Sequence, residues 1–364
     1  MPQKTNTQMS FSAPYVERRK TKKVFLQQVN QIIDWKAISR ILERYYTKGQ
    51  STTGRKAYPP LVLLKMCLLQ TWYNLSDYGI EEQVNDVLSF MRFCDLQLED
   101  EVPDHSIVCR FRKALNDTGA WEVLLRAFNE QLTAHGVLVK QGAIVDASIT
   151  PSPRKPQGPK VYELHQEPEA PLQEPEASLQ EAEAPLQEPE APLQAAPKPG
   201  VDAEASWIKK GGKLQYGYKR HYVCDQGAGL VLSVSTTTAS AHESKHMAPV
   251  LKKANLPVGS SVLADKGYAS ASNEALLKGM GMKSRIQRKA YRNAPLSKWS
   301  IKYNKLISRD RYKIERVFGS ISRWFGGLRA RYVGLLKTHG QHVLEGMAYN
   351  LYRLPGLIVS TSLA

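Results

Sequence analysis

The sequence has few cysteines, and none of them belongs to a close pair. Four occur in 364 residues, at Cys67, Cys94, Cys109 and Cys224, and no CxxC motif is present. A thiolate zinc site needs clustered cysteines, and a small secreted scaffold needs several that form disulfides. The composition therefore excludes both classes and is typical of a protein of the reducing cytoplasm.

The sequence also lacks a long hydrophobic run. The first residues, MPQKTNTQMS, contain no apolar core of the signal-peptide kind, and the longest apolar stretch, LVLLKMCLL, is interrupted by Lys65. A helix that crosses a bilayer needs about 20 consecutive, mostly apolar residues. We therefore expect no membrane segment and no membrane partner.

Acidic residues are scarce relative to basic ones. The chain has 34 Asp and Glu against 50 Lys and Arg, which gives a formal charge of +16 and a pI near 9.5. Basic side chains that neutralise phosphates release condensed counterions, so this balance favours a polyanionic partner. The apolar fraction of 42% is large enough for sizeable cores. The composition thus predicts a folded protein, with nucleic acid as the leading candidate for its partner.

Many of the acids that do occur lie in one proline-rich segment, residues 151–205. Four heptapeptides, QEPEAPL, QEPEASL, QEAEAPL and QEPEAPL, fill residues 166–193 and contain eight glutamates without a basic residue. Proline breaks the helix that a leucine heptad would otherwise suggest, and this composition cannot bury itself. We interpret the segment as a disordered linker. Without the repeat the charge would be +24 (16 + 8).

Residues 1–138 are predicted to form an all-helical domain. Asp34 is placed to cap the helix DWKAISRILERYY, Pro59 and Pro60 to open PLVLLKMCLLQTWYNL, and Asp104 to cap the helix that follows Pro103. The run SDYGIEEQVNDVLSFMRF also has helical periodicity. The expected role of this domain is DNA binding.

Two basic features of this domain leave alternatives open. The helix pair after Pro103 carries Arg110, Arg112 and Lys113, and is either a helix-turn-helix that faces phosphate or a bundle with a solvated basic face. The run RRKTKK, at residues 18–23, is either an arm that contacts DNA or a soluble tail.

Residues 139–355 change to an α/β pattern. The segments GAIVDASI, YGYKRHYV, GLVLSVSTTT and SSVLAD are predicted strands, whereas HMAPVLKKA, SNEALLKGM and the segment after Ile307 are predicted helices. Asp146 and Asp265 each follow three apolar residues of a strand. Either acid by itself is typical of a turn, but two of them in a basic domain favour a divalent cation, which needs clustered oxygens.

A third candidate acid lies in the most basic part of the chain. Residues 275–344 contain 17 Lys or Arg but only two acids, Asp310 and Glu315. Arg311 and Glu315 share a helix face at four-residue spacing, so a surface ion pair is the alternative interpretation. The surplus of positive charge instead favours a phosphate that docks beside Glu315.

These motifs resemble a known family. The segments IVDAS, LADKGY, RYKIERVFGSISRWFG and TTTASAHE, with RKAYPPLVLLKMCLLQTWYNLSDYGIEEQV before them, are similar to bacterial insertion-sequence transposases of the DDE type, and most of all to the insertion-sequence-five family. The resemblance implies a ribonuclease-H-like core. It also implies that Asp146, Asp265 and Glu315 form the catalytic triad and bind two Mg²⁺ ions, which Mn²⁺ can replace.

The family signature around the glutamate is only partly present. Arg311 matches its arginine, but Ser308 and Ser322 stand where the family has tyrosine and lysine. We expect Arg311 to bind DNA and Arg323 to replace that lysine on a phosphate. Lys266 and Tyr268 are expected to contact phosphate and sugar. The departure concerns the residues that clamp the phosphate, and not the metal triad.

The implied chemistry uses two metal ions. One activates the attacking oxygen and the other stabilises the leaving oxygen. Water frees a 3'-OH at the element end, and that hydroxyl then attacks target DNA. The resemblance further implies double-stranded DNA as the partner, both at the terminal inverted repeats of the element and at the target. It also implies a homo-oligomer on the DNA and a cytoplasmic, nucleoid-associated bacterial protein.

Two rival functions remain. The segment HESKH satisfies the zinc-protease pattern through His242, Glu243 and His246, with Glu274 as a further ligand, but Pro249 is expected to interrupt the required helix. The other rival is a transposase relic that binds DNA without cutting it. Zinc content tests the first rival, and metal-dependent nicking tests the second.

Overall fold

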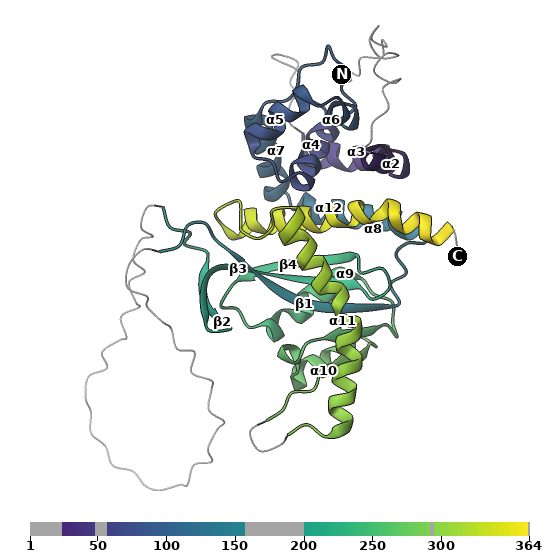
Figure 1. The fold of residues 1–364 in the computed structure, drawn as a ribbon, viewed down its shortest axis with the longest axis vertical. Helices are drawn as coiled ribbons and strands as arrows, with labels where there is room; N and C mark the ends of the chain where they lie inside the picture. Colours follow the sequence, from purple (N-terminus) through teal and green to yellow (C-terminus); the bar gives the residue numbers. More distant parts are fainter. Residues whose placement is uncertain (1–23, 48–56, 157–199, 292–294, 363–364) are drawn as a thin grey trace, which may run out of the picture.

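The computed structural model describes residues 24–47, 57–156, 200–291 and 295–362. Figure 1 shows helices from the N-terminal part above a twisted sheet, with the long helix α12 (Leu335–Ser362) between them. The structure is therefore a mixed α/β fold. The acidic repeat at 166–193 and the basic run at 18–23 lie outside the described residues.

The N-terminal part is helical, as predicted. Its helices are α2 (Val24–Ile32), α3 (Trp35–Tyr45), α4 (Pro60–Trp72), α5 (Asp77–Asp86), α6 (Leu88–Phe93), α7 (His105–Asp117) and α8 (Ala120–Ala134). Asp34 accepts from the first backbone amides of α3, Asp104 accepts from those of α7, and Pro60 is the first residue of α4, so all three predicted helix starts are confirmed. The single helical run expected up to Phe93 is wrong, because Val87 is extended and separates α5 from α6.

In the part of the chain that the structure describes, the sheet has six strands. They are β1 (Gly142–Pro151), β2 (Ser206–Lys210), β3 (Lys213–Asp225), β4 (Val231–Thr238), β5 (Ser261–Ala264) and β6 (Lys283–Ile286). Their order is β2-β3-β1-β5-β6, and β4 also pairs with β3. Strand β3 is antiparallel to β1, β2 and β4, whereas β5 and β6 are parallel to β1. The four predicted strands are confirmed, and β2 and β6 were missed.

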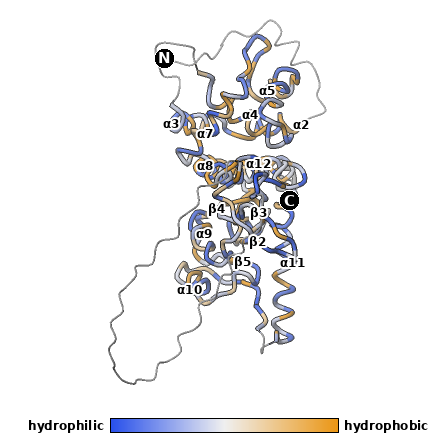
Figure 2. The backbone as a smooth tube through the Cα atoms, turned by 90° about the vertical axis from the view of Figure 1, so that its left-hand side faces the viewer, coloured by the Kyte–Doolittle hydropathy of each residue, from blue (hydrophilic) through white to orange (hydrophobic). Residues whose placement is uncertain are grey.

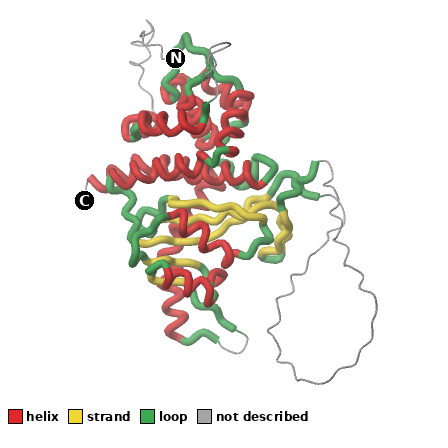
Figure 3. Tube along the Cα trace, turned by 180° about the vertical axis from the view of Figure 1, so that it is seen from behind, coloured by secondary structure: helices red, strands yellow, loops and turns green. Residues whose placement is uncertain are grey.

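Helices cover the sheet on several sides. The helix α11 (Lys298–Trp324) packs against β1 and β5, and α9 (Met247–Ala254) packs against β3 and β4. Figures 1 and 3 place α11 and α9 on opposite faces of the sheet. The helix α10 (Ala271–Gly279) lies beside β6. Two short 3₁₀ turns, η1 (Glu243–His246) and η2 (Lys266–Tyr268), precede α9 and α10.

The hydrophobic core is continuous between the helical part and the sheet. Helix α4 is buried along almost its whole length and is mainly hydrophobic (Figure 2). Its Trp72 donates from Nε1 to the carbonyl of Ala348 in α12 at 2.8 Å, and α8 packs on α12 and β4. The predicted domain boundary at residue 138 stays a prediction, because the helices on its two sides share one hydrophobic core and no separate core marks the boundary.

The predicted linker is folded at both ends. Asp202 is fully buried and accepts hydrogen bonds from the hydroxyls of Ser152 at 2.7 Å and Tyr218 at 2.6 Å. The folded part therefore extends into residues 151–156 and 200–205, which were expected to be disordered. Across the described ranges, no helix has the length and apolarity needed to span a membrane.

Candidate active site

Asp146 and Asp265 lie on neighbouring parallel strands at matching positions. Val145 of β1 pairs with Ala264 of β5, so the residue that follows each of them is an aspartate at the same level of the sheet. The residues before both acids are buried. The expectation that two strands carry a carboxylate out of the core is confirmed, and the topology explains why the two acids meet.

Arg311 of α11 lies between the two carboxylates. Its Nη2 is 2.6 Å from Oδ2 of Asp146, and its Nη1 is 4.0 Å from Oδ1 of Asp265. The Arg311 side chain is 10% exposed, that of Asp146 15% and that of Asp265 35%. The alternative of a surface pair between Arg311 and Glu315 is therefore wrong, because Arg311 is buried and turned toward the sheet. The predicted contact of Arg311 with DNA is wrong in this structure for the same reason, since its guanidinium bonds to Asp146.

The electrostatics of this cluster favour a further cation. Burial raises the pKa of Asp146, and the nearby Asp265 raises it further, while the Arg311 guanidinium and the backbone amide of Ala147 act in the opposite direction. One guanidinium faces two carboxylates, which leaves a formal surplus of one negative charge when both acids are ionised. Hard oxygen donors with surplus charge suit a divalent cation.

Gln287 orients Arg311, and sequence reasoning missed it. Its Oε1 accepts from Nη1 of Arg311 at 3.4 Å, and its Nε2 donates to the hydroxyl of Ser308 at 2.7 Å. Gln287 follows β6 as Asp265 follows β5, since Ala264 pairs with Ile286. The signal was a polar residue at the end of a third parallel strand, which is visible only once KSRI is recognised as a strand.

Glu315 lies one helical turn after Arg311 on α11, about 6 Å along the helix axis. Its side chain is exposed. Within the described ranges it forms no ion pair, and no three His, Cys, Asp or Glu side chains are close enough together to hold a metal ion. The structure thus brings together Asp146 and Asp265 and leaves Glu315 on the neighbouring turn.

The two residues predicted to touch DNA after Asp265 have different environments. Lys266 is exposed, so its proposed contact with phosphate stays a prediction. Tyr268 is fully buried, and burial raises its pKa. The expectation that Tyr268 contacts the sugar is wrong in this structure, because its ring packs in the core.

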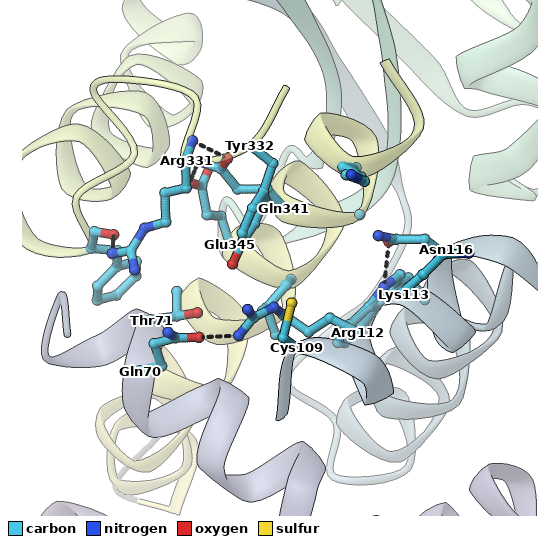
Figure 4. A pocket seen from close by; sticks show the side chains of 15 residues that line it. Gln70, Thr71, Cys109, Arg112, Lys113, Asn116, Arg331, Tyr332, Gln341 and Glu345 are labelled. Atoms are coloured by element: carbon cyan, nitrogen blue, oxygen red, sulfur yellow. Dashed lines mark hydrogen bonds between the residues drawn. The ribbon is translucent and has the colours of Figure 1, made fainter. Parts of the chain in front are cut away.

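The helix-turn-helix expectation fails at Arg112. Its side chain is buried, with Nη2 2.6 Å from Oδ2 of Asp77 and Nη1 2.8 Å from Oε1 of Gln70. Figure 4 shows it beside a cavity of about 140 Å³ between α7 and α12. Arg112 therefore holds helices together and does not face phosphate. The partner helix α8 packs on β4 and α12, so it is not free to enter a groove.

The remaining predicted DNA contacts are exposed. Arg110 bonds to Ser106 on its own helix, and Lys113 pairs with Asp117 at 2.6 Å. Arg323 lies near the end of α11, with its guanidinium 5.4 Å from the ring of Trp324. All three stay predictions.

The zinc-protease pattern has the wrong geometry. Residues 243–246 form a 3₁₀ turn, and His242 precedes it and bonds to Ser244, so the two histidines do not share an α-helical face. Glu243 lies 3.5 Å from Lys219, and Glu274 accepts from Ser284. Pro249 lies in the first turn of α9, which begins only at Met247. This rival is therefore wrong.

Paired carboxylates on neighbouring strands of a basic α/β fold are typical of metal-dependent enzymes that act on phosphodiesters. Comparison with known proteins narrows this class. Residues 139–351 match the family described as Transposase DDE domain, and residues 14–114 match Transposase domain (DUF772). The transposase for insertion sequence element IS1106 of Neisseria meningitidis serogroup B is 35% identical over 246 residues, which are 67% of this chain and 76% of that protein.

Solved transposase structures give weaker matches. A piggyBac transposase synaptic complex with hairpin DNA has a TM-score of 0.40 at 10% identity and covers 93% of this chain and 75% of its own. A Mos1 transposase paired-end complex has a TM-score of 0.21 at 10% identity, with 95% and 94% covered. The assignment rests on the sequence matches: the chain belongs to the DDE transposases, metal-dependent enzymes that cleave DNA and join its strands.

Proposed function

We propose that the protein is the transposase of an insertion sequence similar to the insertion-sequence-five family. It binds the terminal inverted repeats of its element, cleaves DNA at the element ends, and joins the 3'-OH to target DNA. The family match and the IS1106 relative support this proposal. The narrower assignment to the insertion-sequence-five family rests on the sequence motifs alone, namely IVDAS, LADKGY and the segment around Glu315.

The proposed core is ribonuclease-H-like. Strands β1, β3 and β4 form an antiparallel set, and β5 and β6 extend the sheet in parallel with β1. This topology brings two acids from strands far apart in sequence to one level of the sheet, which supports the proposal.

The observation that carries the proposed mechanism is the sharing of Arg311 by two aspartates. Asp146 and Asp265 would hold Mg²⁺, or Mn²⁺ in its place, and Glu315 would complete the set from the next turn of α11. Two such ions, when bound, activate the attacking oxygen and stabilise the leaving one. Arg311 keeps the two carboxylates together while Gln287 fixes its guanidinium.

The proposed DNA surface combines Lys266, Arg323, Arg110 and Lys113, which are exposed. The 17 basic residues between 275 and 344 support contact with phosphates close to the aspartates. Joining two element ends calls for at least two copies, so we propose a homo-oligomer on DNA in the bacterial nucleoid.

Glu315→Gln tests the placement of the triad. The change removes one charge from an exposed side chain, so we expect an unchanged melting temperature and loss of Mg²⁺-dependent nicking of a duplex that contains an element end. Asp310→Asn is the matched control, since Asp310 lies on the same helix but bonds to Gln226. Nicking by Glu315→Gln at the level of Asp310→Asn would remove Glu315 from the mechanism.

A further inference from the structure

The segment HESKH, residues 242–246, has no zinc-protease geometry, but it lies next to the turn that follows Asp265. It comes after β4 and forms the 3₁₀ turn η1, which packs against η2. The fold therefore brings Glu243 close to a residue of the aspartate pair from which it is far removed in the chain.

The carboxylate of Glu243 contacts two parts of the molecule, one through each oxygen. Its Oε1 lies 3.5 Å from Nζ of Lys219, a residue of β3 whose side chain is only 4% exposed. Its Oε2 faces Gly267 of η2, since a Cβ atom placed on that glycine would lie 3.2 Å from this oxygen. Glu243 therefore connects a buried strand to the turn that follows Asp265.

Lys219 fixes the first end of this connection. Its Nζ donates to the carbonyl of Ala241 at 2.7 Å, directly before the HESKH segment. Burial lowers the pKa of Lys219, and the carboxylate of Glu243 acts in the opposite direction. The buried ammonium group thus holds both the backbone before η1 and the acid of η1.

The turn at the other end sets the direction of Asp265. The amide of Tyr268 donates to the carbonyl of Asp265 at 3.0 Å, and the carbonyl of Tyr268 accepts from Nδ2 of Asn273 at 2.8 Å. The carboxylate of Asp265 accepts from the amide of Lys266. Because the Asp265 side chain is 35% exposed, its direction depends more on this turn than on packing. A displacement of Gly267 therefore moves the carboxylate.

The hydroxyl of Tyr268 links Glu243 to the other aspartate of the pair. The hydroxyl is buried and forms no hydrogen bond with any residue that the structure describes. Burial raises the pKa of Tyr268, and Asp146 and Glu243, in that order, raise it further. Both acids act on one buried group, so Glu243 borders the candidate active site.

The contacts of Glu243 are those of a supporting residue. Both oxygens are engaged, one by the buried Lys219 and the other by Gly267, so the acid is placed to support Asp265 and not to bind an ion itself. Groups that orient metal ligands change metal affinity without touching the ion, typically by about 10–100-fold.

We propose that Glu243 is a positioning residue of the transposase reaction: by packing on Gly267 it sets the direction of Asp265, and so raises the affinity of the aspartate pair for its divalent cation. Lys219 anchors it, and the contact acts through shape and not through charge. The proposal rests on the proposed function for the metal site at Asp146 and Asp265.

Mn²⁺ binding to the full-length, DNA-free protein tests the proposal, with the free ion measured by electron paramagnetic resonance. Glu243→Ala and Glu243→Gln both remove the charge that faces Lys219, so they should lower the melting temperature equally. Only glutamine keeps a side chain of the same shape on Gly267. We therefore expect Glu243→Ala to weaken Mn²⁺ binding about 10-fold, and Glu243→Gln less than about 3-fold.

Nicking should follow the same order, because the Mg²⁺ concentration for half-maximal activity depends on the same affinity. If the charge left on Lys219 prevents folding, the two variants are compared in a Lys219→Met background, where the difference between them should persist. Glu122→Ala is the matched control, since Glu122 also pairs with a lysine, Lys253, but lies on α8. It should leave Mn²⁺ affinity unchanged.

Equal weakening by Glu243→Gln and Glu243→Ala would show that the charge of Glu243 acts on the ion, and would overturn the proposal. Unchanged Mn²⁺ affinity in both variants would overturn it as well, while leaving the metal site in place. A wild-type protein that binds no Mn²⁺, or an Asp265→Asn variant that binds it normally, would instead remove the metal site at the aspartates, and this proposal with it.

Discussion

Arg112 in the helical part and Arg311 in the α/β part each approach an aspartate oxygen at 2.6 Å, but they differ in the number of carboxylates they serve. Arg112 has one, Asp77, whose other oxygen accepts from Gln70 at 2.6 Å. Arg311 has two, Asp146 and Asp265. Arg331 also acts on Asp77, so the first cluster has no surplus negative charge, whereas the second cluster has one.

This difference separates a structural ion pair from a candidate site. In the cluster of Arg112 the carboxylate of Asp77 already has two guanidinium groups acting on it, so a further cation would gain nothing. In the cluster of Arg311 a buried carboxylate with a raised pKa lies beside a second carboxylate, and Asp265 is open to solvent. Both clusters have the same short distance between arginine and aspartate. The number of carboxylates around the arginine is therefore what distinguishes a candidate metal site from a structural ion pair.

The largest expected effect comes from removing one acid of each cluster. Asp146→Asn and Asp265→Asn should each reduce metal-dependent nicking about 1,000-fold or more, since metal ions contribute several kcal/mol to such reactions. Their melting temperatures should be unchanged or higher, because Arg311 keeps one carboxylate. Asp77→Asn should instead cost about 2 kcal/mol of stability, because it leaves the buried Arg112 without its counter-ion, and should spare nicking at 25 °C. Destabilisation by Asp146→Asn as large as that by Asp77→Asn would remove the distinction.

Substitution of Arg311, which the two aspartates share, tests the same comparison by removing the cation instead of an acid. Arg311→Gln leaves two neighbouring carboxylates without a cation, so the metal-free melting temperature should fall by several degrees. Mg²⁺ or Mn²⁺ should then raise the melting temperature of the variant more than that of the wild type, because the ion no longer competes with the guanidinium. A metal response no larger than that of the wild type would show that Arg311 does not occupy a cation site.

Acidification tests a third kind of buried polar group, which has no counter-ion. Burial first, then His246 and Lys219, lower the pKa of His221 to about 3, and its Nε2 lies 3.0 Å from the hydroxyl of Thr237. Below pH 6.5 the unfolded chain takes up a proton that the native histidine refuses, so stability falls as the pH falls, until about pH 3. We expect a loss of about 2 kcal/mol between pH 7 and pH 5 from this residue.

Thermal denaturation over that range checks the sign. His221→Gln should flatten the curve, though not fully, because burial also holds the pKa of His342 well below its usual value. The raised pKa of Asp146 acts in the opposite direction, because the native carboxyl takes up a proton more readily than the unfolded one. Adding Asp146→Asn to His221→Gln should therefore make stability fall more steeply with falling pH than in His221→Gln alone. A wild-type protein that becomes more stable toward pH 5 would contradict the assignment of neutral buried histidines.

Features that depend on residues close together in the chain could be predicted from the sequence, and features that depend on distant residues could not. Caps such as Asp34 and Asp104, and the acids that follow the buried residues of β1 and β5, depend on neighbours in the chain, and they were predictable. Strand β6 was not, because KSRI is short and mostly polar. The burial of Arg112 depends on Asp77, 35 residues away, and a basic side chain on a helix carries no local sign of such a partner.

The smallest expected effect is that of deleting residues 166–193, a repeat with eight glutamates and no basic residue. Halving a loop changes its closure free energy by about 0.6 kcal/mol, so folding and nicking should be nearly unchanged. Affinity for non-specific duplex should rise, because the charge increases from +16 to +24 (16 + 8). Asp202→Asn is the informative control, since Asp202 is buried and fastens the base of this insertion to Ser152 and Tyr218, and its loss should lower the melting temperature measurably. If the deletion abolished nicking in a protein that melts like the wild type, the repeat would be part of the catalytic machinery, and surplus acids would matter in this protein beyond the pair that shares Arg311.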